Sequence, residues 1–375
     1  MKKIFPSAMC LVLAVSMLCT SVCADFSEDI SAHSAILYCA DTGDVLYEKN
    51  ADEHMLIASI TKIMTAIVVI ENCDLDAEIV PEPEWCCIEG SSMYLDYTKS
   101  YTIRDILTGM MLVSGNDAAT ALACNLAGDE RSFSAKMNEK AKELGMENSS
   151  FRNPHGLDDS EHYSTARDMA VLASYCMENE EFRNIVSKYT ATVGEQTYVN
   201  HNKLLREYDG CIGLKTGYTM AAGRTLVSCA ERNGMRLICV TLSAPDDWND
   251  HKKLLDYGFE SYSISSFSER NFRLNLPIAS AVVKTAAAVP ENDITVLTKS
   301  DDNVDVKLEA PRILFAGGLQ GEKIGSIRVF INGELAAEEN LVYTENVPVD
   351  KSVHLSGLEQ MQRLVQFGAK PFYIS

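Results

Sequence analysis

The alternation of hydrophobic and polar positions predicts a group of helices between two groups of strands over most of the chain. Two alternating segments, 35–39 and 45–47, flank a turn at 41–44 and predict a β-hairpin. A helical period predicts five helices, at 59–70, 103–112, 117–126, 133–144 and 165–177. Three more strand patterns follow, at 214–216, 224–230 and 236–242. Strands at both ends with helices between them favour an α+β layer structure over alternating βαβ units.

The pattern changes near residue 265, and the chain beyond it predicts a second domain. The stretch 261–268 is rich in serine and indicates a boundary, after which the period becomes that of strands. Asn332-Gly333 predicts a type I′ hairpin between two such strands. We therefore expect a small all-β domain over 269–348. A helical tail at 349–375 has one apolar face, which either packs on its own domain or touches a membrane peripherally.

The composition is that of a globular protein with a large acidic excess. The 375 residues allow two or three domains, and 46% of them are hydrophobic, which excludes wholesale disorder. The 53 acidic and 33 basic residues give a net charge of −20. This charge excludes nucleic acid and anionic membranes as partners bound through net charge.

Residues 1–24 have the pattern of a signal peptide. Two lysines precede an apolar stretch at 8–18 that is too short to span a bilayer, and a small-residue cleavage site ends at Ala24. The mature chain is therefore expected to begin at Asp25 and to be exported. An uncleaved N-terminal anchor is the alternative.

Three short strings carry side chains that can form a nucleophilic site. They are Ser59-x-x-Lys62, Ser114-Gly-Asn116 and Lys215-Thr216-Gly217. The first is weak alone, the other two are moderate signals, and their combination in this order is strong. The alternative is that both lysines are solvated surface residues, as most lysines are.

The spacing of the first string fits a serine that a lysine activates. Residues three apart on a helix lie on one face, so Lys62 can reach the hydroxyl of Ser59. That hydroxyl needs a base, and a lysine amine can act as one when burial or a nearby cation lowers its pKa. Lys215 is that cation if its strand passes beside the helix start. Backbone N–H groups at the helix start would stabilise an oxyanion.

Together the strings resemble the active site of the penicillin-binding serine enzymes. More narrowly, the chain resembles the low-molecular-mass D-alanyl-D-alanine carboxypeptidases. The other similar segments are Gly90–Met93, Ser114–Ala118, Phe151–Leu157, Lys215–Thr219 and Leu254–Phe259. The resemblance covers about residues 30–265. It implies a β-lactamase-like or transpeptidase-like catalytic domain over 25–268, an antiparallel sheet with helices on both faces.

The resemblance also implies a role for each matching residue. Ser59 would be the acylated nucleophile and Lys62 its general base. Ser114 would relay a proton to the leaving amine, and Asn116 would hold the substrate amide.

On the third string, Lys215 and Thr216 would bind the terminal carboxylate. Gly217 and Tyr218 follow on the same strand, and the N–H groups of Ser59 and Tyr218 would form the oxyanion hole. No metal or cofactor is implied.

One departure from the family concerns the substrate carboxylate. Many members carry an arginine shortly before the segment matched here by Leu254–Phe259, and it helps to hold that carboxylate. Here the run 246–253 contains three aspartates, and the chain has no arginine between Arg236 and Arg270. We therefore expect Lys215 and Thr216 to bind the carboxylate alone.

The resemblance implies a serine D,D-carboxypeptidase that removes the terminal D-Ala from peptidoglycan stem peptides and that penicillins acylate. It would act in the cell wall or at the outer face of the cytoplasmic membrane. Two alternatives stay open: a D,D-endopeptidase or β-lactamase of the same group, and a non-catalytic wall-binding scaffold. Residues 160–170 contain no Glu-x-x-x-Asn string to supply a β-lactamase with its deacylating base.

Overall fold

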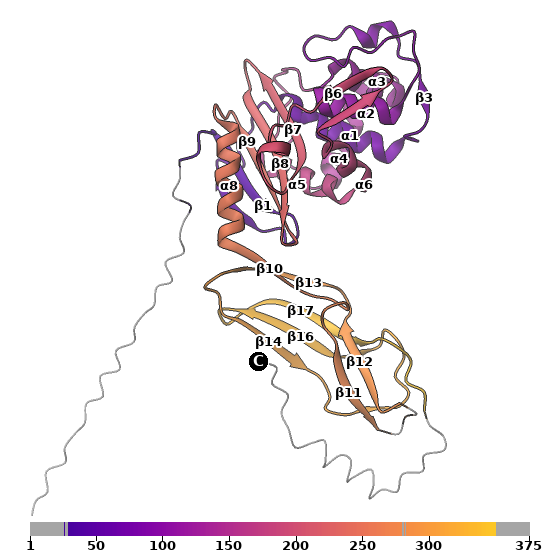
Figure 1. The fold of residues 1–375 in the computed structure, drawn as a ribbon, viewed down its shortest axis with the longest axis vertical. Helices are drawn as coiled ribbons and strands as arrows, with labels where there is room; N and C mark the ends of the chain where they lie inside the picture. The colour runs from indigo at the N-terminus through magenta and orange to yellow at the C-terminus, as the bar shows by residue number, and fades with distance from the viewer. Residues whose placement is uncertain (1–25, 27–28, 280, 282, 350–375) are drawn as a thin grey trace, which may run out of the picture.

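The computed structural model describes residue 26 and residues 29–279, 281 and 283–349. In Figure 1 a mixed helix-and-strand part stands above a smaller part made of strands. The predicted signal peptide (1–24) and all but the first residue of the predicted helical tail (349–375) lie outside the described residues. Within the described ranges, the helices are all too short or too polar to cross a membrane.

A five-stranded antiparallel sheet forms the centre of the larger part, in the order β2-β1-β9-β8-β7. Its strands are β1 (Ser34–Cys39), β2 (Val45–Lys49), β7 (Cys211–Thr219), β8 (Gly223–Arg232) and β9 (Met235–Leu242). The N-terminal hairpin β1–β2 therefore pairs, through β9, with strands that lie much later in the chain, after the helices of 62–186. The predicted hairpin and the three later strands are confirmed, and all five lie in one sheet.

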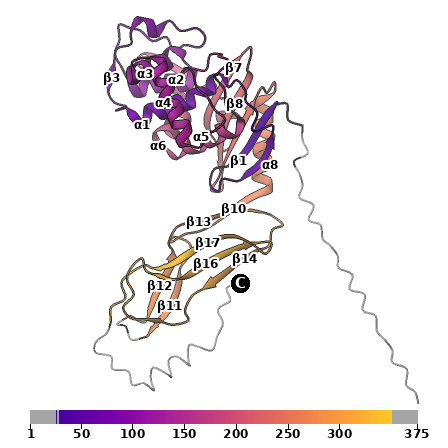
Figure 2. The same cartoon turned by 180° about the vertical axis from the view of Figure 1, so that it is seen from behind.

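Helices cover both faces of this sheet (Figures 1 and 2). The helices of one face are α1 (Lys62–Asn72), α2 (Ile103–Val113), α3 (Asn116–Ala127), α4 (Glu130–Glu143), α5 (Ala166–Glu178) and α6 (Glu180–Val186). The other face carries α8 (Asp247–Ser261). The strands divide their side chains between two cores: Ile36 of β1 packs with the helical group, and Leu37 packs with Leu254 of α8. The predicted α+β class is thereby confirmed.

Short elements complete this part. They are η1 (Ala58–Thr61), β3 (Glu78–Ile79), η2 (Pro83–Cys86), β4 (Tyr101–Thr102), β5 (Thr190–Val193), β6 (Gln196–Val199) and α7 (Leu204–Glu207). The five predicted helices are confirmed. Helix α4 begins three residues before the predicted start, at Glu130, because the Asp129 side chain caps it by accepting from the Ser132 N–H at 2.7 Å. Gly145 follows its end with a φ of 73°.

The smaller part contains a six-stranded sheet in the order β14-β16-β17-β12-β11-β15. The strands are β11 (Leu274–Ala279), β12 (Thr285–Pro290), β14 (Val304–Glu309), β15 (Leu314–Phe315), β16 (Lys323–Ile331) and β17 (Glu334–Tyr343). Asn332 and Gly333 join the last two with φ values of 54° and 86°, as a type I′ turn requires. A third apolar cluster, which includes Ile327 and Leu341, forms the core of this sheet.

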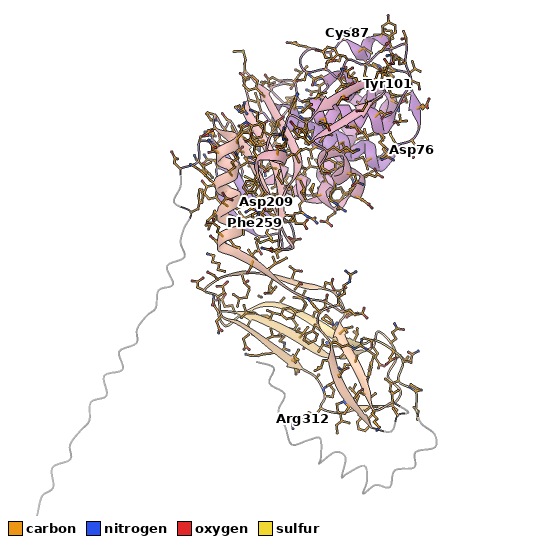
Figure 3. All side chains as sticks on the ribbon, viewed as in Figure 1. Asp76, Cys87, Tyr101, Asp209, Phe259 and Arg312 are labelled. Carbon is orange, nitrogen blue, oxygen red and sulfur yellow. The ribbon has the colours of Figure 1, made fainter. Side chains whose placement is uncertain are left out.

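A two-stranded ribbon lies between the two parts. Its strands are β10 (Tyr262–Phe267), which follows α8 directly, and β13 (Ile294–Lys299). Tyr262 and Ile264 pack against the core under α8, whereas Ile294 belongs to the core of the smaller part. The serine-rich stretch is therefore a strand. Figure 3 shows the labelled Phe259 near this ribbon and Arg312 at the far end of the smaller part.

Candidate active site

The first string forms a tight hydrogen-bonded turn at the edge of the sheet. Ser59 lies in the 3₁₀ turn η1, and Lys62 is the first residue of α1. Residues i and i+3 of a 3₁₀ turn eclipse one another, so the two side chains are aligned. The Lys62 Nζ donates to the Ser59 Oγ at 3.1 Å. The sequence predicted an α-helical spacing here, and the 3₁₀ turn achieves the same contact.

The Lys62 amine is also held from two distant segments. Its Nζ donates to the Asn116 Oδ1 at 2.7 Å and to the His155 backbone oxygen at 2.6 Å. Asn116 is fixed in turn, because its Nδ2 donates to the Glu89 backbone oxygen at 2.6 Å. The Asn116 and His155 oxygens hold the buried Lys62 amine in place, and so fix the direction in which it faces Ser59.

The second string connects two helices. Ser114 has a left-handed φ of 63° and caps the end of α2, and Asn116 begins α3. The sharp turn between the helices brings both residues to the site, where Ser114 lines the same cleft as Ser59. Both are buried, with 4% of each residue exposed.

The third string lies on β7, directly beside η1. Gly217 permits this approach, since a Cβ built on it would lie 2.9 Å from the Ser59 backbone nitrogen and 2.4 Å from the Thr225 Oγ1. Lys215 is 1% exposed and its Nζ donates to the Thr216 backbone oxygen at 2.8 Å. Tyr218 follows at the exposed end of the strand. The structure thus brings all the predicted site residues together.

Burial changes the proton affinity of both lysines. Desolvation, with the charge of Lys215 as a second cause, lowers the pKa of Lys62 well below its ordinary value of 10.5. Desolvation alone lowers the pKa of Lys215 from 10.5 to about 7. The two side chains are therefore not the solvated surface lysines of the alternative interpretation. An amine that loses its proton this readily can accept one from Ser59 near neutral pH.

These side chains open into a cleft of about 1010 Å³. Its lining includes Ser59, Ser114 and Thr216, together with Tyr198 and Val199 of the β5–β6 hairpin. In the part of the chain that the structure describes, no group of three or more His, Cys, Asp or Glu side chains is arranged to hold a metal ion. The cleft offers a serine hydroxyl with a buried amine beside it, and a lining of both polar and apolar side chains.

The three aspartates of the run 246–253 do not face the cleft as free charges. Asp246 accepts from the Asn249 Nδ2 at 3.0 Å, and Asp250 is buried under backbone N–H groups that include Ala32 at 2.9 Å. Asp247 lines the cleft, but it is paired with Arg224 at 2.9 Å. Asp246 and Asp250 are not among the residues that line the cleft, and the charge of Asp247 is offset by its pairing with Arg224.

Asp117 fixes the loop that covers the site. Its buried carboxylate accepts from the Ser92 Oγ at 2.7 Å, the Met93 N–H at 2.9 Å and the Leu95 N–H at 3.0 Å. We expect Asp117→Asn to destabilise the protein by about 2–4 kcal/mol, because the new NH₂ group would face donors in a buried place. Urea unfolding followed by circular dichroism measures this change.

Asp129→Asn is the matched control. Asp129 accepts the Ser132 N–H at an exposed helix start, where asparagine caps equally well. This variant is expected to unfold at the wild-type urea concentration. Equal midpoints for Asp117→Asn and the wild type would show that the loop does not depend on this carboxylate.

Sequence reasoning did not predict several features of the site. The His155 carbonyl lies in the Phe151–Leu157 segment that the resemblance covers, but no pattern marks it as a partner of Lys62. The β5–β6 hairpin comes from a short segment with no clear period. Arg224 and Asp247 are paired across elements, and no pattern within either segment marks this contact. It depends on how α8 packs against β8.

Known proteins share both this sequence and this fold. A family model described as D-alanyl-D-alanine carboxypeptidase, peptidase S11, matches residues 20–246. D-alanyl-D-alanine carboxypeptidase DacF of Bacillus subtilis is 34% identical over 333 residues, which cover 84% of this chain and 86% of the relative.

Two solved structures are similar as well. Penicillin-binding protein 5 of Haemophilus influenzae superposes with a TM-score of 0.70 at 28% identity, covering 86% of this chain and 98% of the other. Penicillin-binding protein D2 of Listeria monocytogenes, solved in its ampicillin-bound form, has a TM-score of 0.57 at 34% identity, covering 61% and 98%. With a family match over more than half of its length, and with the serine and lysine side by side in the cleft, the chain belongs to the D-alanyl-D-alanine carboxypeptidases of the S11 serine peptidase family.

Proposed function

We propose that this enzyme removes the terminal D-Ala from peptidoglycan stem peptides through an acyl-enzyme on Ser59. The observation that carries this proposal is the contact between the Ser59 hydroxyl and a buried lysine amine of lowered pKa. A nucleophile paired with such a base, lining a cleft of about 1010 Å³, is the arrangement that acyl transfer requires.

Acylation begins with a proton transfer from Ser59 to the neutral amine of Lys62. The Ser59 oxygen attacks the carbonyl carbon of the penultimate D-Ala, and the N–H groups of Ser59 and Tyr218 hold the oxyanion. Ser114 relays a proton to the nitrogen of the terminal D-Ala. The C–N bond then breaks, free D-alanine leaves, and the peptide remains as an ester on Ser59.

Deacylation reverses the roles of the attacking and leaving groups. A water molecule gives a proton to Lys62 and attacks the ester carbon, and the Ser59 oxygen leaves with a proton. Penicillins would acylate Ser59 in the same way, because they present a similar carbonyl group and carboxylate.

Asn116 and the third string position the substrate. The Nδ2 of Asn116 has two hydrogens, so it can donate to the substrate amide as well as to Glu89. Thr216 lines the cleft and would bind the terminal carboxylate, with Lys215 behind it as a source of positive charge.

The proposal includes the place of action and the division of the chain. Residues 1–24 would direct export and be removed, so that the enzyme acts outside the cytoplasm on the cell wall. Residues 25–268 would form the catalytic domain and 269–348 a small β domain. The apolar face of the tail at 349–375 would make a peripheral contact with the membrane.

The test is the release of D-alanine by residues 25–375 from a tripeptide that ends in Lys-D-Ala-D-Ala. We expect release without any added metal, and a single penicillin adduct that mass spectrometry maps to Ser59. Release by a protein whose adduct maps to another residue would contradict the assigned nucleophile. Labelling of Ser59 without D-alanine release would indicate a different substrate, such as a cross-linked peptide.

A further inference from the structure

The cleft lies in an acidic protein but has a cationic corner. Its basic lining residues are His201, Lys203 and Arg224, and Asp247 is the acidic residue among those that line it. Burial lowers the pKa of His201, which leaves its ring neutral at pH 7. The lasting positive charges on the wall of the cleft are therefore those of Lys203 and Arg224.

The register of the sheet places Arg224 beside Thr216. Tyr218 of β7 lies opposite Arg224 of β8, and Thr216 lies opposite Leu226. Residues two apart on a strand share a face, so Thr216 and Arg224 are diagonal neighbours on one face of the sheet. Diagonal neighbours lie about 7–8 Å apart, with their Cβ atoms somewhat closer, and an arginine side chain can span that distance.

Lys215 lies on the opposite face of the same strand. Successive side chains of a strand alternate, so Lys215 points toward Lys62 when Thr216 points away from it. With 1% of its surface exposed, the Lys215 amine has little access to the substrate. Arg224 has 41% of its side chain exposed, and a guanidinium stays protonated at every physiological pH.

Asp247 and Trp248 hold the guanidinium at the cleft wall. The Nε donates to the Asp247 Oδ1 at 3.0 Å, and the Nη2 lies 2.9 Å from the same oxygen. The centre of the guanidinium lies 5.7 Å from the centroid of the Trp248 ring. Asp247 is 2% exposed and is itself fixed by the Trp248 N–H at 2.9 Å. A guanidinium has five N–H donors, so donors remain for a second carboxylate.

We propose that Arg224, reaching in from β8 and held by Asp247, is the residue that binds the free carboxylate of the substrate's terminal D-Ala beside Thr216. This inference rests on the proposed function and names the residue that gives it specificity. It also changes the expectation from the sequence, in which Lys215 and Thr216 bind the carboxylate alone. Asp247 acts as a positioning residue, since it touches Arg224 and not the substrate.

The consequence is a preference for peptides that end in a free carboxylate. A charge-assisted hydrogen bond to a carboxylate is lost when that group is an amide, and the Arg224 charge is then left without its partner. The wild type should therefore cleave the Lys-D-Ala-D-Ala tripeptide far better than the same tripeptide with a C-terminal carboxamide.

The experiment compares both peptides in the wild type, Arg224→Gln and Arg224→Lys. We expect Arg224→Gln to lower kcat/KM for the acid peptide about 10- to 100-fold and for the amide peptide less than about threefold. Arg224→Lys should recover part of the loss. Lys252→Gln is the matched control, since it removes one charge from α8 that pairs with Glu207 outside the cleft.

Two further measurements separate the possible failures. The double variant Arg224→Gln/Asp247→Asn leaves no buried carboxylate without its partner, so a loss of preference in this variant is not caused by that unpaired charge. The rates at which penicillin and its methyl ester acylate Ser59 provide a second comparison of a free carboxylate with a blocked one, at the acylation step. The two penicillins test Arg224 even if the wild type releases no D-alanine. A wild type that reacts with penicillin but releases no D-alanine would overturn the proposed function and leave the role of Arg224 open to this test.

An unchanged preference for the acid over the amide peptide in Arg224→Gln would overturn the inference and leave the proposed function intact. An equal loss in Lys252→Gln would overturn it as well, because net charge alone would then explain the effect. A wild type that neither cleaves the peptide nor reacts with penicillin would overturn both proposals.

Discussion

Ser59→Ala is expected to abolish D-alanine release from the Lys-D-Ala-D-Ala tripeptide and to abolish labelling by penicillin. The hydroxyl that the Lys62 amine contacts at 3.1 Å is the atom that would carry the acyl group, and alanine has no substitute for it. Loss of a nucleophile that acts as a unit with its base typically lowers kcat by on the order of 10⁴-fold or more. Coupled detection of D-alanine and mass spectrometry of the penicillin adduct measure the two losses separately.

Ser132→Ala is the control for this variant. Ser132 is exposed on α4, away from the residues that line the cleft, and its loss should leave both readouts at the wild-type level. D-alanine release that persists in Ser59→Ala would exclude Ser59 as the nucleophile. If Ser59→Ala loses D-alanine release but leaves the cellular role of the protein unchanged, the scaffold interpretation replaces the enzymatic one.

The sequence could predict those parts of the site that depend on local spacing. Ser59 and Lys62 meet because they are three positions apart, and this contact needs only one turn of helix. In the same way, Asn332-Gly333 predicts its hairpin because both positions need a positive φ. Both contacts depend on the chain within a few residues, where periodicity and turn chemistry are informative.

The contacts between distant segments could not be predicted in this way. The amine of Lys62 is held by Asn116 and by the His155 carbonyl, and no spacing indicates which backbone oxygen will lie beside a buried amine. Arg224 faces the cleft because β8 pairs with β7 in one particular register. Shifting that register by one residue would turn its side chain to the other face.

The family resemblance supplied what spacing alone could not. It implied that three strings far apart in the chain meet at one place, and the structure brings them together around Ser59. It also identified the departure at 246–253, where an arginine is missing. The structure places Arg224 against Asp247 at this point, so a cation is present in the cleft although it comes from another strand.

Lys62→Arg is expected to lower kcat/KM by about 10³-fold or more, although it keeps the positive charge. A lysine whose pKa is well below 10.5 can lose its proton and act as a base, whereas a guanidinium stays protonated. Lys62→Met should cause a loss of similar size. If Lys62→Arg keeps its activity and Lys62→Met loses it, Lys62 contributes a positive charge and does not transfer a proton.

The pH dependence of acylation tests the same role with the wild type. The rate of penicillin acylation should fall as the pH is lowered through the pKa of Lys62, because protonation removes the base. It should also fall as the pH rises above about 7, where Lys215 loses the charge that, in the proposed mechanism, polarises the site. In Lys62→Met the acidic limb should disappear, since the group that titrates there is gone. An acidic limb that persists in this variant would assign the base to another residue, and circular dichroism at each pH would show that the fold is retained.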